Sequence, residues 1–519
     1  MKKLPISISN LPEIINDNYI YVDKTSYIKT LIDGNKYCFL SRPRRFGKTL
    51  LVDTLYHLFS SNEKIFQNLY IHPFWDWSIQ YPILRFDLSK KTHKTAKGLN
   101  NYLLAQLGEN QQRLKVKCKQ NNDVSFCFSE LIRIVKEKYQ QRVVILIDEY
   151  DAPILDHITH IETGKEIRTN LQSFYSVIKG EDANLKFVLL TGVSKFAKVS
   201  IFSKLNNLVD IGMNAKFSAL CGYTQKELES YFSDYLQDVD KEELKSWYNG
   251  YHWFGESVYN PFDILLFFNN EKEFLPYWFE TGKTHFLVKL LQKNHYHLPD
   301  LENTSLSFTD LNDFDVGRIR FETLLFQAGY LTISKKKVGR QMKYQFSYPN
   351  FEVRQSLNHY FLQHYLTQQP QSLELIHNTF FKQDFQRLEA GIRVLFDNIP
   401  YNNYSKNNIS RYEGYYASVM YAYLYSLDFD LVPEDTSNKG RIDISVLFTS
   451  PYNNKKQVYL FEFKVLDSDK ADGSALKQIK SRNYAAKYQD KENQIFLIGI
   501  EFSRISRNIV GFDWEQATN

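Results

Sequence analysis

The chain has 519 residues, enough for about three domains that each bury a core of their own. Its composition, 43% apolar and 24% charged, is ordinary for a globular protein, and no apolar run approaches the ~20 residues that span a bilayer. The net charge of +5 permits nucleic-acid binding without requiring it. Four scattered cysteines without a Cys-x-x-Cys pair argue against a zinc knuckle or a disulfide scaffold, so we expect a cytoplasmic protein with no membrane partner.

The first third of the chain alternates apolar runs with helical patterns. Four strand-like runs lie at residues 36–40, 82–88, 143–149 and 187–194. Their hydrophobicity is continuous rather than alternating, which is typical of strands covered on both faces in a parallel sheet. Because helical segments separate the runs, we expect βαβ units that end near residue 220, and therefore an α/β domain over residues 1–222.

The rest of the chain divides into a helical region and a second α/β domain. Thr224, followed three residues later by Glu227, predicts a capped helix start and opens a mainly helical middle region, or lid, over residues 223–374. The domain of residues 375–519 is expected to contain a helix, three strands, a helix and a strand. Their predicted ranges are about 411–427, 429–434, 441–448, 457–465, 474–489 and 494–500.

A phosphate-binding P-loop is expected where the first strand runs into a helix, in Arg42-Pro43-Arg44-Arg45-Phe46-Gly47-Lys48-Thr49. Backbone N–H groups of this loop would hold phosphate oxygens, Lys48 would neutralise phosphate charge, and the Thr49 hydroxyl would bind Mg²⁺. The usual first glycine is replaced by Arg42, which leaves the tight turn in question, while Arg44 and Arg45 can compensate as phosphate-facing charges. The alternative is a basic helix start on a solvated face.

Two acids close the third strand-like run, as they do after a Walker B strand. Asp148 would hold Mg²⁺ through water, and Glu149 would polarise the attacking water as a general base. Thr191 or Ser194, at the end of the following strand, would sense the terminal phosphate, and the sequence does not choose between them. The alternative is a strand that merely ends in exposed acids.

Two apolar, strand-like runs near the C-terminus are interrupted by the charges of Asp443, Glu462 and Lys464. An unpaired buried charge costs several kcal/mol, so these charges need a reason. Residues two apart in a strand share a face, which places Glu462 beside Lys464. Asp443 and Glu462 would bind Mg²⁺, and Lys464 would orient or deprotonate a water or bind a scissile phosphate. The alternative is an ion pair on a merely structural sheet.

This Asp…Glu-x-Lys pattern resembles the core of the PD-(D/E)XK nucleases. Two further residues fit that core by position: Glu413, which would add a carboxylate to the metal site, and Gln478, which would position phosphate or water. The helix of Gln478 also carries basic residues that either contact a nucleic-acid backbone or form an ordinary solvated face, namely Lys477, Lys480, Arg482 and Lys487. A degenerate fold that binds nucleic acid without cutting is a further alternative, but the complete acid and lysine set weighs against it.

Four segments together resemble the bacterial AAA-ATPase-like family, whose members often carry a C-terminal PD-(D/E)XK domain. They are Tyr21–Thr25, Arg42–Thr49, Ile147–Asp151 and Thr191–Lys195. The resemblance implies an N-terminal AAA/STAND-like P-loop sheet with flanking helices, a helical middle region and a restriction-endonuclease-like α/β domain. It also implies that Arg42 is tolerated in the loop and that Tyr21–Thr25 lies near the nucleotide.

The leading hypothesis is an ATP- and Mg²⁺-dependent ATPase coupled to a Mg²⁺-dependent nuclease, with nucleic acid as partner, DNA rather than RNA. A role in defence or mobile-element biology follows from domain pairing alone. One alternative is a nucleotide-dependent signalling switch or scaffold whose C-terminal domain docks without cutting. Another is a pure ATP-driven remodeller. The sequence does not choose ATP over GTP, and it leaves a homo-oligomer open.

Overall fold

The computed structural model describes residues 1–90, 93–120, 122–157, 160–194, 207–279, 298, 301, 304–307, 310–311, 320–337, 343–365, 373–397, 413–427, 429–437, 440–452, 454–490 and 493–517. The chain forms two compact units, one of residues 1–282 and 305–352, the other of residues 283–304 and 353–519. The domain boundaries expected after residues 222 and 374 remain predictions. No helix within the described ranges is long and apolar enough to cross a membrane.

A five-stranded parallel sheet forms the centre of the first unit. Its strands are β1 (Tyr37–Ser41), β2 (Ile83–Asp87), β3 (Val143–Asp148), β4 (Leu185–Gly192) and β5 (Val209–Asp210), in the order β2-β3-β4-β1-β5. All four predicted strands are therefore confirmed, and the short β5 ends the sheet. Because every strand runs the same way, the ends of β1, β3 and β4 meet at one edge, with β4 between the other two.

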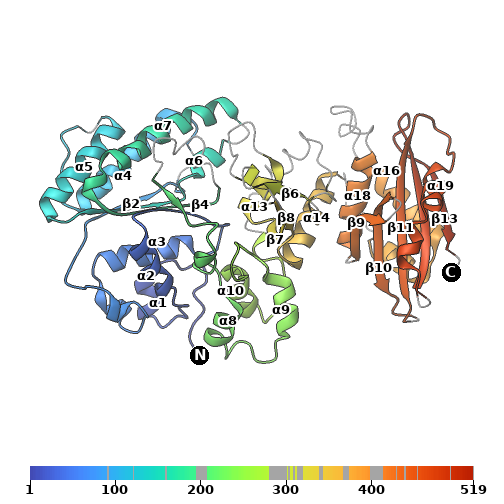
Figure 1. Cartoon of the computed structure of the whole chain (residues 1–519), viewed down its shortest axis with the longest axis horizontal. Helices are drawn as coiled ribbons and strands as arrows, with labels where there is room; N and C mark the ends of the chain where they lie inside the picture. Colours follow the sequence, from blue (N-terminus) through green and yellow to red (C-terminus); the bar gives the residue numbers. More distant parts are fainter. Residues whose placement is uncertain are drawn as a thin grey trace. The chain divides into compact units, whose positions relative to one another are not determined.

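Helices cover both faces of this sheet (Figure 1). On one face lie α4 (Ala96–Arg113), α5 (Val124–Tyr139) and α7 (Ile161–Gly180), and on the other α1 (Leu11–Asn16), α2 (Thr25–Gly34) and α3 (Lys48–Phe59). Phe86 of β2 meets Phe128 of α5 and Phe174 of α7, with ring centroids 5.3 Å away in both cases. This double cover explains why the strands are apolar at successive positions.

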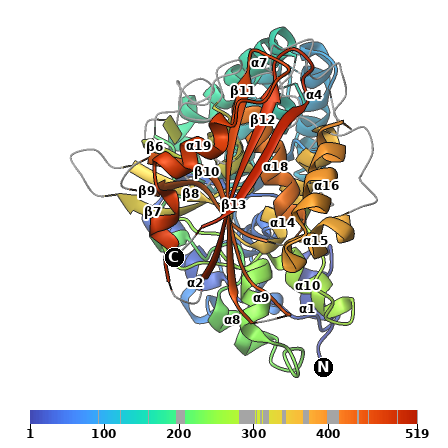
Figure 2. The same ribbon diagram turned by 90° about the vertical axis from the view of Figure 1, so that its right-hand side faces the viewer.

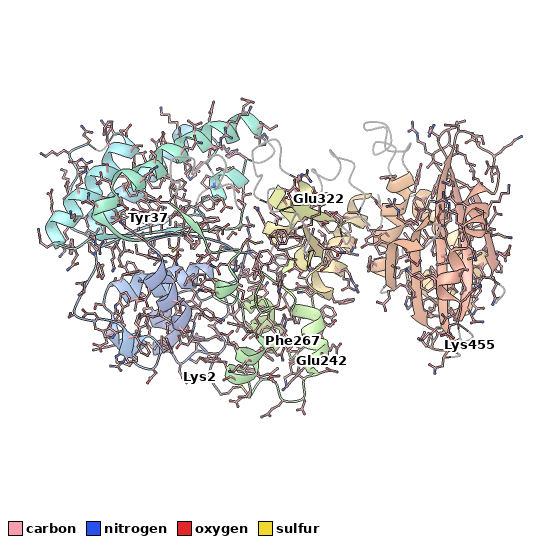
Figure 3. The ribbon with its side chains drawn as sticks, viewed as in Figure 1. Lys2, Tyr37, Glu242, Phe267, Glu322 and Lys455 are labelled. Atoms are coloured by element: carbon pink, nitrogen blue, oxygen red, sulfur yellow. The ribbon has the colours of Figure 1, made fainter. Side chains whose placement is uncertain are left out.

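The remainder of the first unit is built from short helices and a three-stranded sheet. The elements are α6 (Ala152–Leu155), α8 (Gln225–Tyr231), α9 (Lys241–Tyr248), α10 (Pro261–Asn269), α13 (Phe321–Ala328), β6 (Ser305–Ser307), β7 (Thr332–Lys337) and β8 (Lys343–Ser347), followed by α14 (Phe351–Tyr365), which begins here. The predicted capping box of Thr224 and Glu227 is confirmed at the start of α8. Phe267 of α10 is fully buried among the helices of this region (Figure 3).

The second unit contains a mixed sheet in the order β13-β12-β11-β10-β9. Its strands are β9 (Asp430–Ser437), β10 (Gly440–Thr449), β11 (Lys456–Leu466), β12 (Asn493–Ser503) and β13 (Ile509–Gln516), and only β11 and β12 pair in parallel. One face is covered by α15 (Leu373–Lys382), α16 (Phe385–Asp397) and α18 (Glu413–Ser426), and the other by α19 (Ser474–Ser481) (Figure 2). Tyr459 packs against Phe380 of α15, whereas its neighbour Leu460 packs with Ile479 of α19.

Two predictions for this unit were wrong in detail. The helix expected over residues 474–489 ends at Ser481, because Asn483 adopts a left-handed φ of 48° and a short 3₁₀ turn, Tyr484–Tyr488, follows. The fifth strand, β13, was not predicted. Its second half is exposed on the sheet edge, so its residues carry no apolar pattern.

Candidate nucleotide site and candidate metal centre

The loop between β1 and α3 has the backbone geometry of an anion cradle. Arg45 and Gly47 both take positive φ, 69° and 90°, and Gly47 is the residue before the first turn of α3. A Cβ on Gly47 would meet nothing within 4 Å, so glycine is favoured there by its conformation rather than by lack of space. The first N–H groups of α3 have no partner within the helix, and such groups are the donors that bind an anion at a helix N-terminus.

Lys48 lies folded back onto its own loop. Its Nζ is 3.1 Å from the Arg42 carbonyl oxygen, 3.0 Å from that of Pro43 and 3.1 Å from Oε1 of Glu149. Its side chain is buried, and that of Glu149 is mostly covered. The predicted phosphate-binding ammonium and the predicted general base are therefore in contact, and a bound phosphate would compete with Glu149 for Lys48.

Asp148 is the centre of the predicted Mg²⁺ ligands. The Thr191 hydroxyl donates to its Oδ1 at 2.5 Å, and its carboxylate is also hydrogen-bonded to the side chain of Thr49. Burial, followed by the charge of Glu149, raises the pKa of Asp148, and the two threonine hydrogen bonds oppose that rise. The structure thus brings together side chains from α3, β3 and β4 that offer the oxygen ligands preferred by Mg²⁺.

Ser194 has a different partner from Thr191. Both its N–H and its hydroxyl donate to the buried carboxylate of Asp151, which also accepts from the N–H of Val193 at 3.2 Å. Of the two residues proposed to sense the phosphate, Thr191 is the one that touches Asp148. Asp151 was not predicted as a site residue, although it lies two residues after Glu149 and could have been found as a third acid.

Arg42 points away from the phosphate cradle. Its guanidinium is buried and donates to the carbonyl oxygens of Ser41, Gly212 and Phe217 at 2.9, 2.7 and 3.0 Å. It also stacks on Trp253, 4.0 Å from the ring centroid, and burial lowers its pKa to about 10. The residue in place of the usual glycine therefore fastens the loop to segments that follow the sheet.

Other loop residues contact the same region. Phe46 is buried against Tyr251 and Trp253, with ring centroids 4.7 and 5.6 Å away. The indole of Trp278 donates to the Arg44 carbonyl at 3.1 Å, and Pro43 packs on Gly329 so closely that a Cβ there would lie 2.7 Å from the proline ring. Arg44 and Arg45 are exposed, with Arg45 4.8 Å from the ring centroid of Phe262. Of the predicted phosphate-binding residues, Pro43 and Phe46 thus also serve packing.

The segment Tyr21–Thr25 makes contacts that hold elements together. Lys24 forms an ion pair with Glu227 of α8 at 2.6 Å. Asp23 accepts from the N–H of Tyr70 at 2.7 Å, and the Thr25 hydroxyl accepts from the N–H of Ile71 at 3.1 Å. These bonds account for the residue types in the segment, and its predicted closeness to a nucleotide remains a prediction.

A buried pair of carboxyl groups is linked to the loop through Trp278, which bonds to both. Asp263 of α10 and Glu352 of α14 are both fully buried, and Glu352 accepts from the N–H groups of Trp278 and Phe279 at 2.9 and 3.2 Å. Burial, followed by the charge of Glu352, raises the pKa of Asp263 well above its usual range. A raised pKa favours the protonated form of Asp263 beside Glu352, so we expect the pair to share a proton and to lose stability when the pH rises far enough to remove it.

We expect Glu352→Gln to stabilise the protein at high pH. The amide keeps an oxygen for the two N–H groups, donates to Asp263 and removes one charge, so the free energy of unfolding should rise by about 1–3 kcal/mol at pH 8.5. Because the pKa of Asp263 is raised on folding, the wild type regains stability as the pH falls through that pKa. The gain should therefore shrink by pH 5.5. Thermal unfolding at both pH values measures it, with exposed Glu273→Gln as control; an equal gain at both values would contradict the shared proton.

The C-terminal acids and lysine meet where β10 and β11 run side by side. Ile444 of β10 pairs with Phe461 of β11 in the antiparallel ladder, so Asp443 and Glu462 follow at the same end of this pair. Oδ2 of Asp443 accepts from the N–H of Phe463 at 2.8 Å. Phe463 packs toward Phe502, on the α18 side of the sheet, whereas Glu462 bonds to α19 on the other side. Glu462 is buried, and Asp443 and Lys464 are partly exposed.

Gln478 joins this group. Its Nε2 donates to Oε1 of Glu462, so the structure places the predicted helix residue against the predicted metal ligand. Glu413 is the first residue of α18, but its side chain lies outside the described residues.

Mg²⁺ fits this set by ligand chemistry but not by number. The carboxylates of Asp443 and Glu462 are hard oxygen donors of the kind that Mg²⁺ prefers. Within the described part of the chain, no three His, Cys, Asp or Glu groups gather closely enough to hold a metal ion by themselves. An ion held by Asp443 and Glu462 would thus draw its other ligands from water or substrate oxygens, which Mg²⁺ commonly retains.

The basic residues near Gln478 have unequal surroundings. Lys487 lies in the turn after α19, where it pairs with the buried carboxylate of Asp435, and is therefore not on the helix as predicted. Lys480 pairs with Glu515 at 2.6 Å on the exposed side, and Lys477 donates to the Asp472 carbonyl at 2.7 Å. Arg482 contacts the Tyr484 hydroxyl at 3.4 Å. The group is thus less uniformly available to a nucleic acid than its sequence indicated.

Glu501 was missed by sequence reasoning. It is a buried carboxylate in β12, opposite Lys464 in the parallel register, and interrupts an apolar strand just as Asp443 and Glu462 do. The same signal could therefore have found it.

Comparisons with known proteins match the two parts of the chain that hold these residues. Residues 5–202 match a family described as "Predicted AAA-ATPase", and residues 411–512 match the PD-(D/E)XK nuclease superfamily. The "Uncharacterized protein in vnfD 5'region" of Azotobacter chroococcum mcd 1 is 45% identical over 516 residues, 98% of each chain. A structure of Drosophila ORC bound to AT-rich DNA and Cdc6 covers 67% of this chain and 93% of that chain at 12% identity, with a TM-score of 0.18 that carries no structural argument. The chain therefore belongs to the bacterial AAA-ATPase-like family, with a PD-(D/E)XK nuclease-superfamily domain at its C-terminus.

Proposed function

We propose that the protein binds ATP at the Arg42–Thr49 loop and cleaves phosphodiester bonds of nucleic acid, DNA in preference to RNA, at Asp443, Glu462 and Lys464. The observation that carries the proposal is the contact of Gln478 with Glu462 beside Asp443, because it brings together at one site residues that lie far apart in the sequence. Nucleotide binding would regulate cleavage, in a cytoplasmic protein.

At the C-terminal site, Asp443 and Glu462 would hold Mg²⁺, which when bound acidifies water and neutralises charge on the phosphate. The Lys464 ammonium, two residues from Glu462 on the same strand, would orient the attacking water or bind the scissile phosphate. Gln478 holds the carboxylate of Glu462 in place from α19. Glu413 would supply a further carboxylate.

At the N-terminal site, the N–H groups of the loop and Lys48 would hold the phosphates, and Thr49 and Asp148 would hold Mg²⁺. Glu149 would polarise the attacking water once a phosphate has drawn Lys48 away from it, since the two side chains are paired at 3.1 Å. Thr191 would report on the terminal phosphate through its hydrogen bond to Asp148. Ser194 would act only through Asp151, because its hydroxyl donates a hydrogen bond to the Asp151 carboxylate.

We expect Lys48→Ala to abolish stabilisation by nucleotide. ATP with Mg²⁺ at 100 times its Kd should raise the free energy of unfolding of the wild type by about 2.7 kcal/mol. The variant lacks the ammonium that binds phosphate and should show almost no rise in thermal unfolding temperature with ATP. Lys64→Ala, an exposed lysine beyond α3, is the matched control and should respond as the wild type does. An unchanged ATP response in Lys48→Ala would exclude the loop as the nucleotide site.

The switch alternative makes a different prediction in the same experiments. It requires the ATP response of the wild type, lost in Lys48→Ala, but no metal-dependent cleavage of labelled single-stranded DNA, double-stranded DNA or RNA. The pairing of Lys48 with Glu149 is compatible with slow turnover, since the general base is engaged until a phosphate arrives.

A further inference from the structure

Glu501 lies beneath the N-terminus of the helix that carries Gln478. It is 1% exposed, and its two oxygens accept four hydrogen bonds from the turn that opens α19. The donors are the N–H groups of Asp472, Gly473 and Ala475, at 2.9, 3.1 and 3.2 Å, and the hydroxyl of Ser474, at 3.1 Å. A carboxylate at a helix N-terminus satisfies donors that have no partner within the helix and is favoured by the helix dipole.

The strand and the helix are also in direct backbone contact at this point. A Cβ on Gly499, two residues before Glu501 on β12, would lie 2.3 Å from the backbone nitrogen of Leu476. No side chain fits there, so α19 rests on β12 without a spacer. The height of the helix above the sheet is therefore set by Gly499, and the position of its first turn by Glu501.

The register of β11 and β12 connects this anchor to the site. Glu462 pairs with Gly499 and Lys464 pairs with Glu501 in the parallel ladder, so all four positions face α19. Gln478, one turn into that helix, donates to Glu462. A shift of the first turn would move Gln478 and release the carboxylate that it holds.

We propose that Glu501 is a positioning residue of the nuclease site, which acts through α19 and Gln478 to orient Glu462. The proposal rests on the proposed function for its effect on cleavage, but its structural content is independent of cleavage. Partners that orient metal-ligating side chains typically alter metal affinity or activity by ~10–100-fold when removed.

The test compares Glu501→Gln with Gln478→Ala and with the double variant. The glutamine keeps the shape but presents an NH₂ group to backbone donors, so the first turn should loosen. We expect kcat for Mg²⁺-dependent cleavage to fall by about 10–100-fold, with little change in KM for the nucleic acid. Because both residues act on Glu462 through one path, the double variant should be scarcely worse than Gln478→Ala alone.

Metal affinity gives a second readout. Titration of the full-length protein with Mn²⁺ should show weaker binding in Glu501→Gln, again with no further loss in the double variant. Glu515→Gln is the matched control, because Glu515 also bonds to α19, through Lys480, but on the exposed side. Ser474→Ala removes one of the four donors and gives a milder variant if Glu501→Gln does not fold.

The outcomes separate the two proposals. Suppose that the wild type cleaves. If Glu501→Gln cleaves equally well, or if it lowers cleavage by the same factor in the wild type and in Gln478→Ala, the positioning role is overturned and the nuclease proposal stands. Absence of cleavage, together with Mn²⁺ binding that depends on Glu501 through Gln478, would support the positioning role and reject the nuclease. Mn²⁺ binding that is equal in all variants, without cleavage, would overturn both.

Discussion

Lys464→Ala should remove metal-dependent cleavage while leaving the fold and nucleotide binding intact. Lys464 supplies the positive charge closest in sequence to Glu462 and is partly exposed on the face that bears α19. Removal of one group that stabilises charge in a transition state typically costs ~10²–10³-fold in kcat. The measurement is cleavage of labelled single-stranded DNA, double-stranded DNA and RNA with Mg²⁺ or Mn²⁺, with and without ATP.

Lys480→Ala controls for loss of a nearby positive charge. Lys480 lies on α19 in an exposed ion pair with Glu515, so its loss should weaken substrate binding slightly and leave kcat unchanged. Equal effects of the two substitutions on KM alone would mean that Lys464 binds the nucleic acid without a role in cleavage. Cleavage that persists in Lys464→Ala at the wild-type rate would place the active site elsewhere or assign it to a contaminant.

Arg42→Gly restores the residue that P-loops usually carry, yet we expect it to destabilise the protein. The carbonyl oxygens of Gly212 and Phe217 lose their buried donors, and Trp253 loses the group stacked on it. The unsatisfied buried carbonyl oxygens and the cavity left by the arginine side chain together should lower the free energy of unfolding by about 3–5 kcal/mol. Thermal unfolding monitored without nucleotide measures the loss, which should be visible as a lower transition temperature for the first unit.

Two further variants show which property of the Arg42 side chain stabilises the protein. Arg42→Lys keeps the charge but cannot donate in a planar fork to three carbonyls, so it should recover little of the lost stability. Arg45→Ala removes an exposed arginine from the same loop and should change stability by less than ~1 kcal/mol. If Arg42→Gly were as stable as the wild type, the buried hydrogen bonds would not fasten the loop.

The longer strands, β1 to β4 of the first unit and β9 to β12 of the second, were predictable because their sequences are apolar runs. The last strand of the second unit, β13, was not, because its outer half is exposed and its residues resemble a loop. The end of α19 depends on the left-handed backbone of Asn483, a conformation that a single asparagine only permits. Local pattern therefore located the elements better than it located their ends.

Candidate site residues could be picked out from the sequence where the chemistry demands a residue type, as with Lys48 or Glu462, and their roles stay predictions. The direction of a side chain was not predictable, and Arg42 illustrates this: the sequence raised only the question of the tight turn, whereas the Arg42 side chain is buried and stacks on Trp253. The choice between Thr191 and Ser194 depended on which carboxylate each hydroxyl reaches. Such contacts join residues far apart in the sequence, and no local pattern encodes them.

The packing of the phosphate loop limits how this protein can be recombined. Arg42 and Phe46 belong to the loop, but they fill a core completed by Trp253 and Tyr251. A fragment ending at residue 222 would leave these side chains without cover, and a loop taken from a different P-loop protein would leave a cavity beneath Trp253. Chimeras within this family should therefore exchange the loop together with its aromatic partners, and a natural change at Trp253 should select for a compensating change at Arg42.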